Sequence, residues 1–158
     1  MDFSADISRF STAAQRYCAW LEATPGAAAQ EHFNAIRLIA ELYAAALSLP
    51  GTEPTSETAP SLSQEQRNSI RHRLKSFPFQ YYWEVFEPIA DAPPDAVCAD
   101  ITDDLAGIYF DVKEGLLAYP TDEQGAVWYW TISFGFHWGR HATSALRALH
   151  SYDPESAE

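Results

Sequence analysis

The sequence predicts an all-α fold, in which four long helices and one short helix form an up-and-down helical bundle with an aromatic-rich irregular segment packed across it. Apolar residues recur at steps of three and four along four long stretches, which is the spacing of one buried helix face. Pro120 interrupts the pattern between the last two stretches, so these must form an antiparallel hairpin. A chain that is 47% hydrophobic and 14% aromatic can also close a core.

The 158 residues suit one helical domain, which we expect to span residues 1–152. Residues 50–62 contain three prolines and no periodic apolar residues, so we expect a flexible loop there. Residues 153–158 are expected to form a disordered acidic tail. No apolar run approaches the ~18 residues of a membrane span, and the first residues lack the basic start of a secretory signal. We therefore expect a cytoplasmic protein with no membrane partner.

The first two long helices are expected at residues 4–23 and 28–49, and a Pro-Gly pair separates them. The wide apolar arc of the second predicts that it is deeply buried. Ser63 and Gln66 have the spacing of a capping box, which predicts a third, short helix with a basic outer side.

Residues 77–88 are strongly aromatic and bounded by prolines. Such a segment is too apolar to remain in water and too rich in proline for a long helix. We expect it to lie across the bundle in an irregular or short extended conformation. Stacking of a ligand ring on these side chains is the rarer alternative.

The last two long helices carry the candidate site. The fourth is expected to begin near Asp100 or Thr102, where carboxylates complement the helix dipole. The fifth is expected at residues 121–152, with His137 and His141 one turn apart on a flank of its apolar face.

The formal charge of −12 argues against nucleic acid, since binding to phosphates needs a basic surface. Residues 84–123 hold eleven acidic side chains and one lysine, whereas residues 63–75 hold four basic side chains and one acid. This asymmetry suits an internal contact, a charged surface for a protein partner, or a solvated face. Cys18 and Cys98 lack CxxC spacing, and we interpret both as small core residues.

Helical geometry brings six side chains to one side of the predicted hairpin. An antiparallel register about Pro120 places Asp104 level with His137, Asp100 level with His141, and Asp111 level with Trp130. The pattern fits three interpretations: a hydrogen-bonded lock, a metal site with His137, His141 and Asp104 as candidate ligands, or an acid-base pair. Neither HExxH nor a paired ExxH motif is present, and no nucleophile can be named.

Several motifs resemble the bacterial family known as domain of unknown function 5063. They include Asp103 to Leu116 (DDLAGIYFDVKEGL), His137 to Ala142 (HWGRHA), Tyr82 to Pro88 (YWEVFEP) and Ala145 to His150 (ALRALH). The resemblance spans nearly the whole chain and implies a small helical bacterial protein, without an established activity or ligand. Gly107 and Phe110 stand where the resemblance implies an acid and a basic residue.

The sequence contains no complete catalytic signature. We therefore expect a non-enzymatic binding or interaction module, without a cofactor, whose acidic or basic surface engages a protein partner. The alternative is a metal-assisted hydrolase that uses a divalent metal and the Asp/His cluster between the last two helices.

Overall fold

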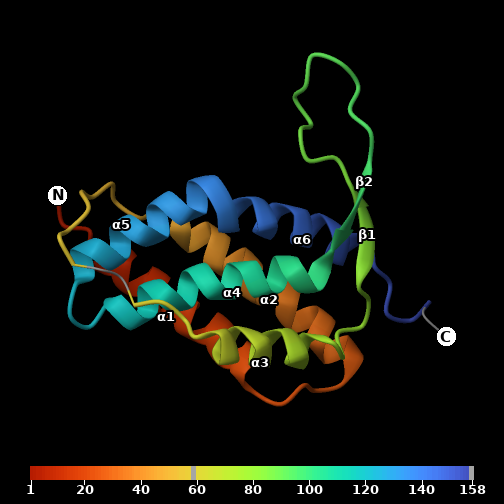
Figure 1. Cartoon of the computed structure of the whole chain (residues 1–158), viewed down its shortest axis with the longest axis horizontal. Coiled ribbons are helices and arrows are strands. Elements are labelled where there is room, and N and C mark those ends of the chain that lie inside the picture. Colours follow the sequence, from red (N-terminus) through yellow and green to blue (C-terminus); the bar gives the residue numbers. More distant parts are fainter. Residues whose placement is uncertain (58–59, 157–158) are drawn as a thin grey trace.

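The computed structural model describes residues 1–57 and 60–156, and it is mostly helical with one small two-stranded sheet (Figure 1). A helical body contains all of the helices, and an arm, residues 81–100, projects from one end of it. The elements in chain order are α1 (Ser4–Glu22), α2 (Ala28–Ala46), α3 (Gln64–Leu74), β1 (Tyr81–Glu84), β2 (Val97–Asp100), α4 (Ile101–Ala118), α5 (Glu123–Ser133), the π-helix η1 (Phe134–Trp138) and α6 (Gly139–Ser151).

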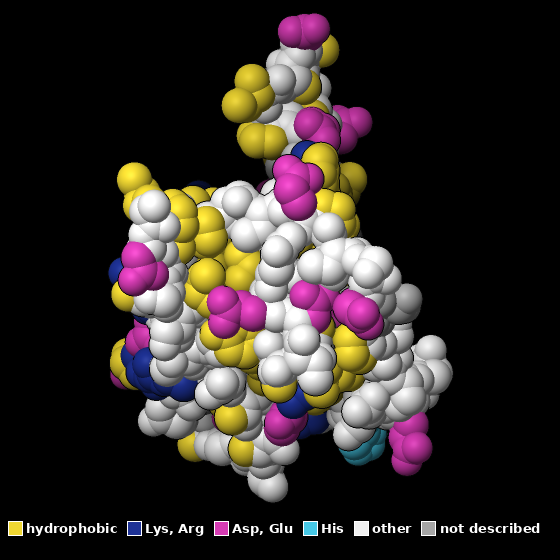
Figure 2. All heavy atoms as spheres, turned by 90° about the vertical axis from the view of Figure 1, so that its left-hand side faces the viewer, with side chains coloured by type: hydrophobic (Ala, Val, Ile, Leu, Met, Phe, Trp, Pro, Cys, Tyr) yellow, Lys and Arg dark blue, Asp and Glu magenta, His cyan; other side chains and the backbone are white. Residues whose placement is uncertain are grey.

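The arm corrects the prediction of an all-α fold with an aromatic segment across it. Strand β1 pairs with β2 in an antiparallel ladder from Tyr81↔Asp100 to Glu84↔Val97. Because the prolines near this segment disfavour a helix, the strand pairing provides its backbone hydrogen bonds instead. Of the aromatic segment, Phe77 is buried and Phe79 stacks on Tyr152, while the rest continues into the arm. Figure 2 shows the arm rising above the body with apolar and acidic side chains on its surface.

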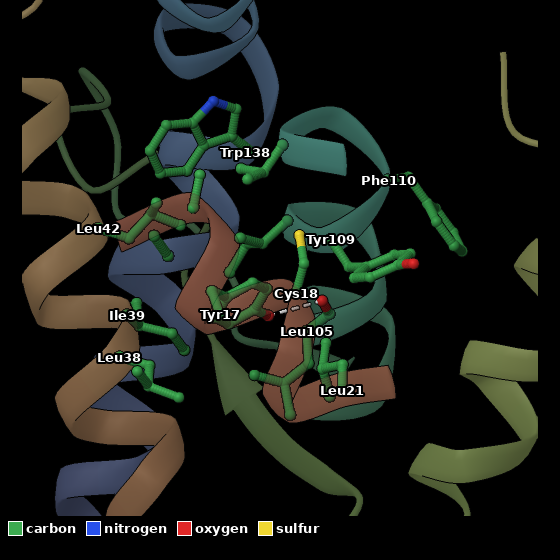
Figure 3. Packing of buried hydrophobic residues seen from close by; sticks show 14 of the residues in the cluster. Tyr17, Cys18, Leu21, Leu38, Ile39, Leu42, Leu105, Tyr109, Phe110 and Trp138 are labelled. Carbon is green, nitrogen blue, oxygen red and sulfur yellow. Dashed lines mark hydrogen bonds between the residues drawn. The ribbon is translucent and has the colours of Figure 1, made fainter. Parts of the chain in front are cut away.

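The core lies where α1, α2, α4 and α6 meet. It contains large fully buried side chains such as Phe10 and Trp138, and Figure 3 shows its packing around Tyr17. The Tyr17 hydroxyl donates a hydrogen bond of 2.8 Å to the carbonyl of Leu105, so this buried polar group is satisfied. The second predicted helix is not buried throughout, because Phe33 in α2 and Leu47, which directly follows α2, are exposed to solvent.

The predicted fifth helix is a column in which α5 continues into α6 (Figure 1), and the π segment η1 joins the two. The N–H of Gly139 donates a hydrogen bond to the carbonyl of Phe134, five residues back, so this turn of the helix contains one more residue than an α-helical turn. Glycine is needed at this position because a Cβ would overlap the Phe134 carbonyl oxygen. The column is therefore not the uninterrupted α-helix that periodicity indicated.

Helix α3 begins with the predicted capping box between Ser63 and Gln66. Before it, the described part of residues 50–62 contains no helix or strand, and Thr55 there donates a hydrogen bond to Asp122. The flexibility of this loop and the domain bounds 1–152 stay predictions. Of the predicted tail 153–158, residues 157–158 lie outside the described part. None of the described helices is long and apolar enough to cross a membrane.

Candidate functional site

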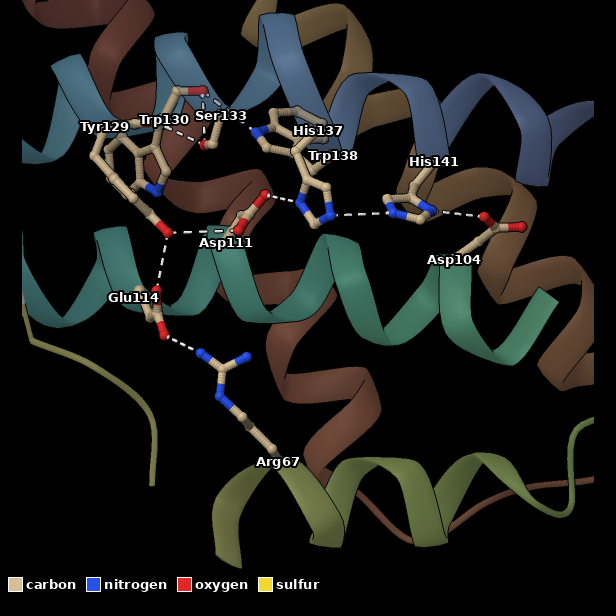
Figure 4. Close-up of polar contacts among 10 residues, drawn as sticks. All are labelled: Arg67, Asp104, Asp111, Glu114, Tyr129, Trp130, Ser133, His137, Trp138 and His141. Atoms are coloured by element: carbon tan, nitrogen blue, oxygen red, sulfur yellow. Dashed lines mark hydrogen bonds and ion pairs between the residues drawn. The ribbon is translucent and has the colours of Figure 1, made fainter. Parts of the chain in front are cut away.

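Eight polar side chains form a continuous hydrogen-bonded row along α4 and the α5–α6 column, and Figure 4 shows all of them except Tyr82. We call this set the polar row. In order, it consists of Tyr82, Asp104, His141, His137, Asp111, Tyr129, Glu114 and Arg67.

Asp104 is the most deeply placed carboxylate of the histidine half of the row. Its Oδ1 lies 2.7 Å from Nδ1 of His141, and its Oδ2 accepts a hydrogen bond of 2.5 Å from the Tyr82 hydroxyl. Because Asp104 is buried, these two partners replace the water that an exposed carboxylate would bind. The contact also ties the base of the arm to α4 and α6.

Asp111 holds the second histidine in the same manner. Its Oδ2 lies 2.6 Å from Nδ1 of His137, and its Oδ1 accepts a weaker bond of 3.4 Å from the Tyr129 hydroxyl. Tyr129 is also 2.9 Å from Glu114, whose other oxygen takes a 2.6 Å ion pair from Arg67. Residues from α3, α4 and α5 thus meet at this end of the row.

The two imidazoles face each other through their remaining nitrogens. Nε2 of His137 and Nε2 of His141 are 3.3 Å apart, and the ring planes are nearly perpendicular at 87°. Since ionised carboxylates only accept hydrogen bonds, each Nδ1 carries a proton. A hydrogen bond between the two Nε2 atoms then requires one further proton, which would make one ring an imidazolium and leave the two Asp–His pairs with one net negative charge.

Burial and hydrogen bonding shift the pKa values along the row. The hydrogen bond to Asp104 raises the pKa of His141, although burial opposes this. Burial raises the pKa of Asp111, against the hydrogen bond and charge of His137. Burial and the neighbouring carboxylates raise the pKa of Tyr82 and of Tyr129, which therefore remain protonated donors.

The structure brings together four of the six candidate residues, but in a different register. His137 pairs with Asp111 rather than Asp104, and His141 pairs with Asp104 rather than Asp100. Side chains lean toward the N-terminus of their own helix, so partners in an antiparallel pair are displaced toward higher residue numbers. The extra residue in η1 displaces them further in the same direction.

The other two candidates lie outside the row. Asp100 caps α4 by accepting a hydrogen bond from the Thr102 N–H, and Trp130 is buried with its indole N–H donating to the Val112 carbonyl. Tyr129, two turns before His137 on the same flank, could have been found by helical spacing. Tyr82 could not, because its place depends on the strand pairing.

Among the described residues, no group of three or more histidine, cysteine or acidic side chains converges as a metal site. Asp104 has both oxygens engaged and lies on the far side of the His141 ring from the His137 nitrogen. The predicted ligand set of Asp104, His137 and His141 therefore does not meet at one point. Of these three side chains, only His137 and His141 bring potential ligand atoms close together, through their Nε2 atoms.

The model of the family described as domain of unknown function (DUF5063) matches residues 1–153. The chain belongs to this family. A crystal structure of protein BF1032 from Bacteroides fragilis is similar, with a TM-score of 0.81, 24% sequence identity and 96% of each chain covered. At that identity the likeness shows the shared fold alone. A comparison with curated proteins gives no match.

Proposed function

We propose that this member of the DUF5063 family is a non-enzymatic protein-binding module whose arm docks onto a basic, partly apolar partner. The arm supports this because four of its large apolar side chains are exposed to solvent: Tyr81 is 67% exposed, Trp83 75%, Phe86 60% and Ile89 97%. Large exposed apolar surfaces on a folded domain mark interaction sites. This exposure is the observation that carries the proposal.

The charge of the arm indicates the chemistry of its partner. Glu84, Glu87, Asp91 and Asp95 lie on it, and the sequence from Ser76 to Val112 contains no lysine, arginine or histidine. A rim of carboxylates around apolar anchors suits a partner that offers lysine or arginine beside an apolar pocket.

The backbone of the arm can also take part. In the described structure β1 and β2 each have one strand neighbour, so the outer edge of this ribbon has backbone groups free for a further strand. Beside the arm, Phe86, Ile89 and Arg140 are among the residues that line a shallow pocket against α6. A partner side chain could enter there while its backbone extends the ribbon.

The basic side of α3 is the weaker candidate surface. Arg67 is paired with Glu114 and Arg73 with Glu31, so two of its cations already serve internal contacts. The guanidinium of Arg71 lies over the ring of Phe110. The charge asymmetry in the sequence is therefore partly an internal contact, which leaves the arm as the freer charged surface.

Metal-assisted hydrolysis at the polar row is less well supported. It needs a substrate pocket, an activated nucleophile and at least three converging ligands. Both oxygens of Asp104 are bound by Tyr82 and His141. Tyr129 and Tyr82 each line a pocket, but His137, His141, Asp104 and Asp111 line none of the five larger pockets of the described residues.

The test is capture of a partner from an extract of the native host with the immobilised full-length chain. We expect one basic protein to be held stoichiometrically by the wild type and lost by the triple variant Trp83→Ser, Phe86→Ser, Ile89→Ser. The variant Leu47→Ser is the control, because Leu47 is also an exposed apolar residue, 67% exposed, but lies on the body. Equal capture by wild type and triple variant, or no capture while both stay folded, overturns the proposal.

A further inference from the structure

We propose that His137 and His141 form a chelating site for a divalent transition metal, with zinc as the best-fitting ion, in which the ion replaces the proton between their Nε2 atoms. The site lies on the helical body and does not depend on the binding role proposed for the arm. It differs from the metal site expected from the sequence, because the carboxylates support the ligands and do not bind the ion.

The distance between the two nitrogens suits this role. A tetrahedral zinc ion bound at about 2.0 to 2.1 Å by two imidazoles holds their nitrogens about 3.3 to 3.4 Å apart. The observed separation of the Nε2 atoms is 3.3 Å. For both lone pairs to point at one ion beside the line that joins the nitrogens, the rings must rotate. The ring of His137 has room to rotate, because its side chain is 53% exposed.

The carboxylates prepare both rings for a metal. Asp111 and Asp104 hold the Nδ1–H groups, which fixes the tautomer that leaves the Nε2 lone pair outward. This arrangement of carboxylate, histidine and metal is the usual support of a zinc ligand. Two carboxylates, two neutral imidazoles and one divalent cation also sum to zero charge, whereas the proton-bridged form keeps one net negative charge.

The backbone is unusual at this position. His137 lies within the π segment and His141 in the first turn of α6, so the pair spans the junction. Segments of π-helix are rare and occur frequently at functional sites. Here Gly139, whose missing side chain permits the wide turn, lies between the two histidines.

The site is open to solvent at His137, whose side chain is 53% exposed. On the α4 side, the buried Gly107 places no side chain against the His141 ring, where a Cβ would lie 3.2 Å from Nε2. An ion there keeps two or more positions for water or an external ligand. Imidazole ligands favour zinc, copper, nickel and cobalt over calcium or magnesium.

The experiment titrates the full-length chain with zinc chloride by calorimetry, in a Cys98→Ser background that removes the exposed thiol. We expect one ion per chain and a rise in melting temperature. Asp111→Asn should weaken binding by about 10- to 100-fold through loss of the ligand's support. His137→Ala should weaken it more, and because His137 is exposed this variant should stay folded.

His150→Ala is the matched control, since His150 is exposed at the end of the same column and should leave zinc affinity unchanged. Cobalt(II) provides a second readout, because tetrahedral coordination gives intense visible absorption that His137→Ala should abolish. Zinc binding that is absent, or unchanged in a folded His137→Ala variant, overturns the site. Either result leaves partner capture by the arm untouched, so the two proposals can fail separately.

Discussion

Nδ1 of His141 lies 2.7 Å from Oδ1 of the buried Asp104, and this contact fastens the last helix to α4. Replacing His141 with alanine leaves the carboxylate with Tyr82 as its remaining partner. Loss of a partner from a buried polar group typically costs about 1–3 kcal/mol, so we expect His141→Ala to lower the free energy of unfolding by that amount.

Urea denaturation at neutral pH, without added metal, measures this difference. His150→Ala should change the free energy of unfolding by less than about 0.5 kcal/mol, because His150 is exposed. If both variants are equally stable, water replaces the imidazole as the hydrogen-bond partner of Asp104, and the contact between Asp104 and His141 does not stabilise the fold.

A second prediction concerns the ion pair between Arg73 and Glu31, in which both side chains are nearly buried. Nη1 of Arg73 lies 2.6 Å from Oε2 of Glu31, and Nη2 donates to the carbonyl of Trp20 near the end of α1. Removing one partner of a buried pair costs about 3–5 kcal/mol because the other charge is left uncompensated. Thermal unfolding of Arg73→Ala should show this loss.

Lys75→Ala serves as the control, since Lys75 is exposed at the end of the same helix. A double variant, Arg73→Ala with Glu31→Gln, should recover part of the lost stability because no uncompensated charge remains. No recovery would mean that Arg73 stabilises the fold through its carbonyl contacts with α1 instead.

The sequence predicted most of the helical structure because burial of one helix face leaves a direct pattern in the chain. Helix α1 was predicted at 4–23 and lies at Ser4–Glu22, and the capping box of α3 is formed as its spacing predicts. The π segment was not predictable in the same manner. Its wide turn depends on the absence of a side chain at Gly139, which has no periodic signature.

The arm and the pairing of the site could not be predicted for a related reason. Strand β1 pairs with a segment that lies beyond the prolines of the arm, and such non-local pairing is not encoded in the spacing of either strand. Helical geometry did bring His137, His141, Asp104 and Asp111 to one side. Helical geometry gave the wrong pairs of residues, because the register was counted at the backbone and side chains point toward the N-terminus of their own helix.

A third prediction uses two helical glycines, one at a crowded position of α4 and one at an open position of η1. A Cβ at Gly115 would overlap the indole of Trp130, which is fully buried and donates to the Val112 carbonyl. Overpacking of a core costs about 1–3 kcal/mol, so Gly115→Ala should lower the melting temperature clearly. At Gly135 a Cβ meets nothing within 4 Å, and Gly135→Ala should raise stability by about 0.5–1 kcal/mol through helix propensity. Calorimetric unfolding of both variants tests this, and a stable Gly115→Ala would show that Trp130 can move.

The last prediction is a pH dependence at the cap of α4. Burial raises the pKa of Asp100, but hydrogen bonds from Thr102 and Gln80 outweigh it and leave the pKa below its ordinary value. A carboxyl whose pKa is lowered on folding stabilises the fold above its unfolded pKa of about 3.9, and this stabilisation is lost as pH falls through the folded value. Asp100→Ala should therefore cost about 0.5–2 kcal/mol at neutral pH, and less at about pH 3.

Urea denaturation at the two pH values measures the difference, with two controls. Asp100→Asn keeps a capping oxygen without the charge, so it should cost less than alanine at neutral pH and match the wild type more closely in acid. Asp95→Ala, on the exposed arm, should have no effect at either pH. If the cost of Asp100→Ala is the same at both values, the capping bond acts without the charge, and the lowered pKa of Asp100 contributes nothing to the stability of the fold.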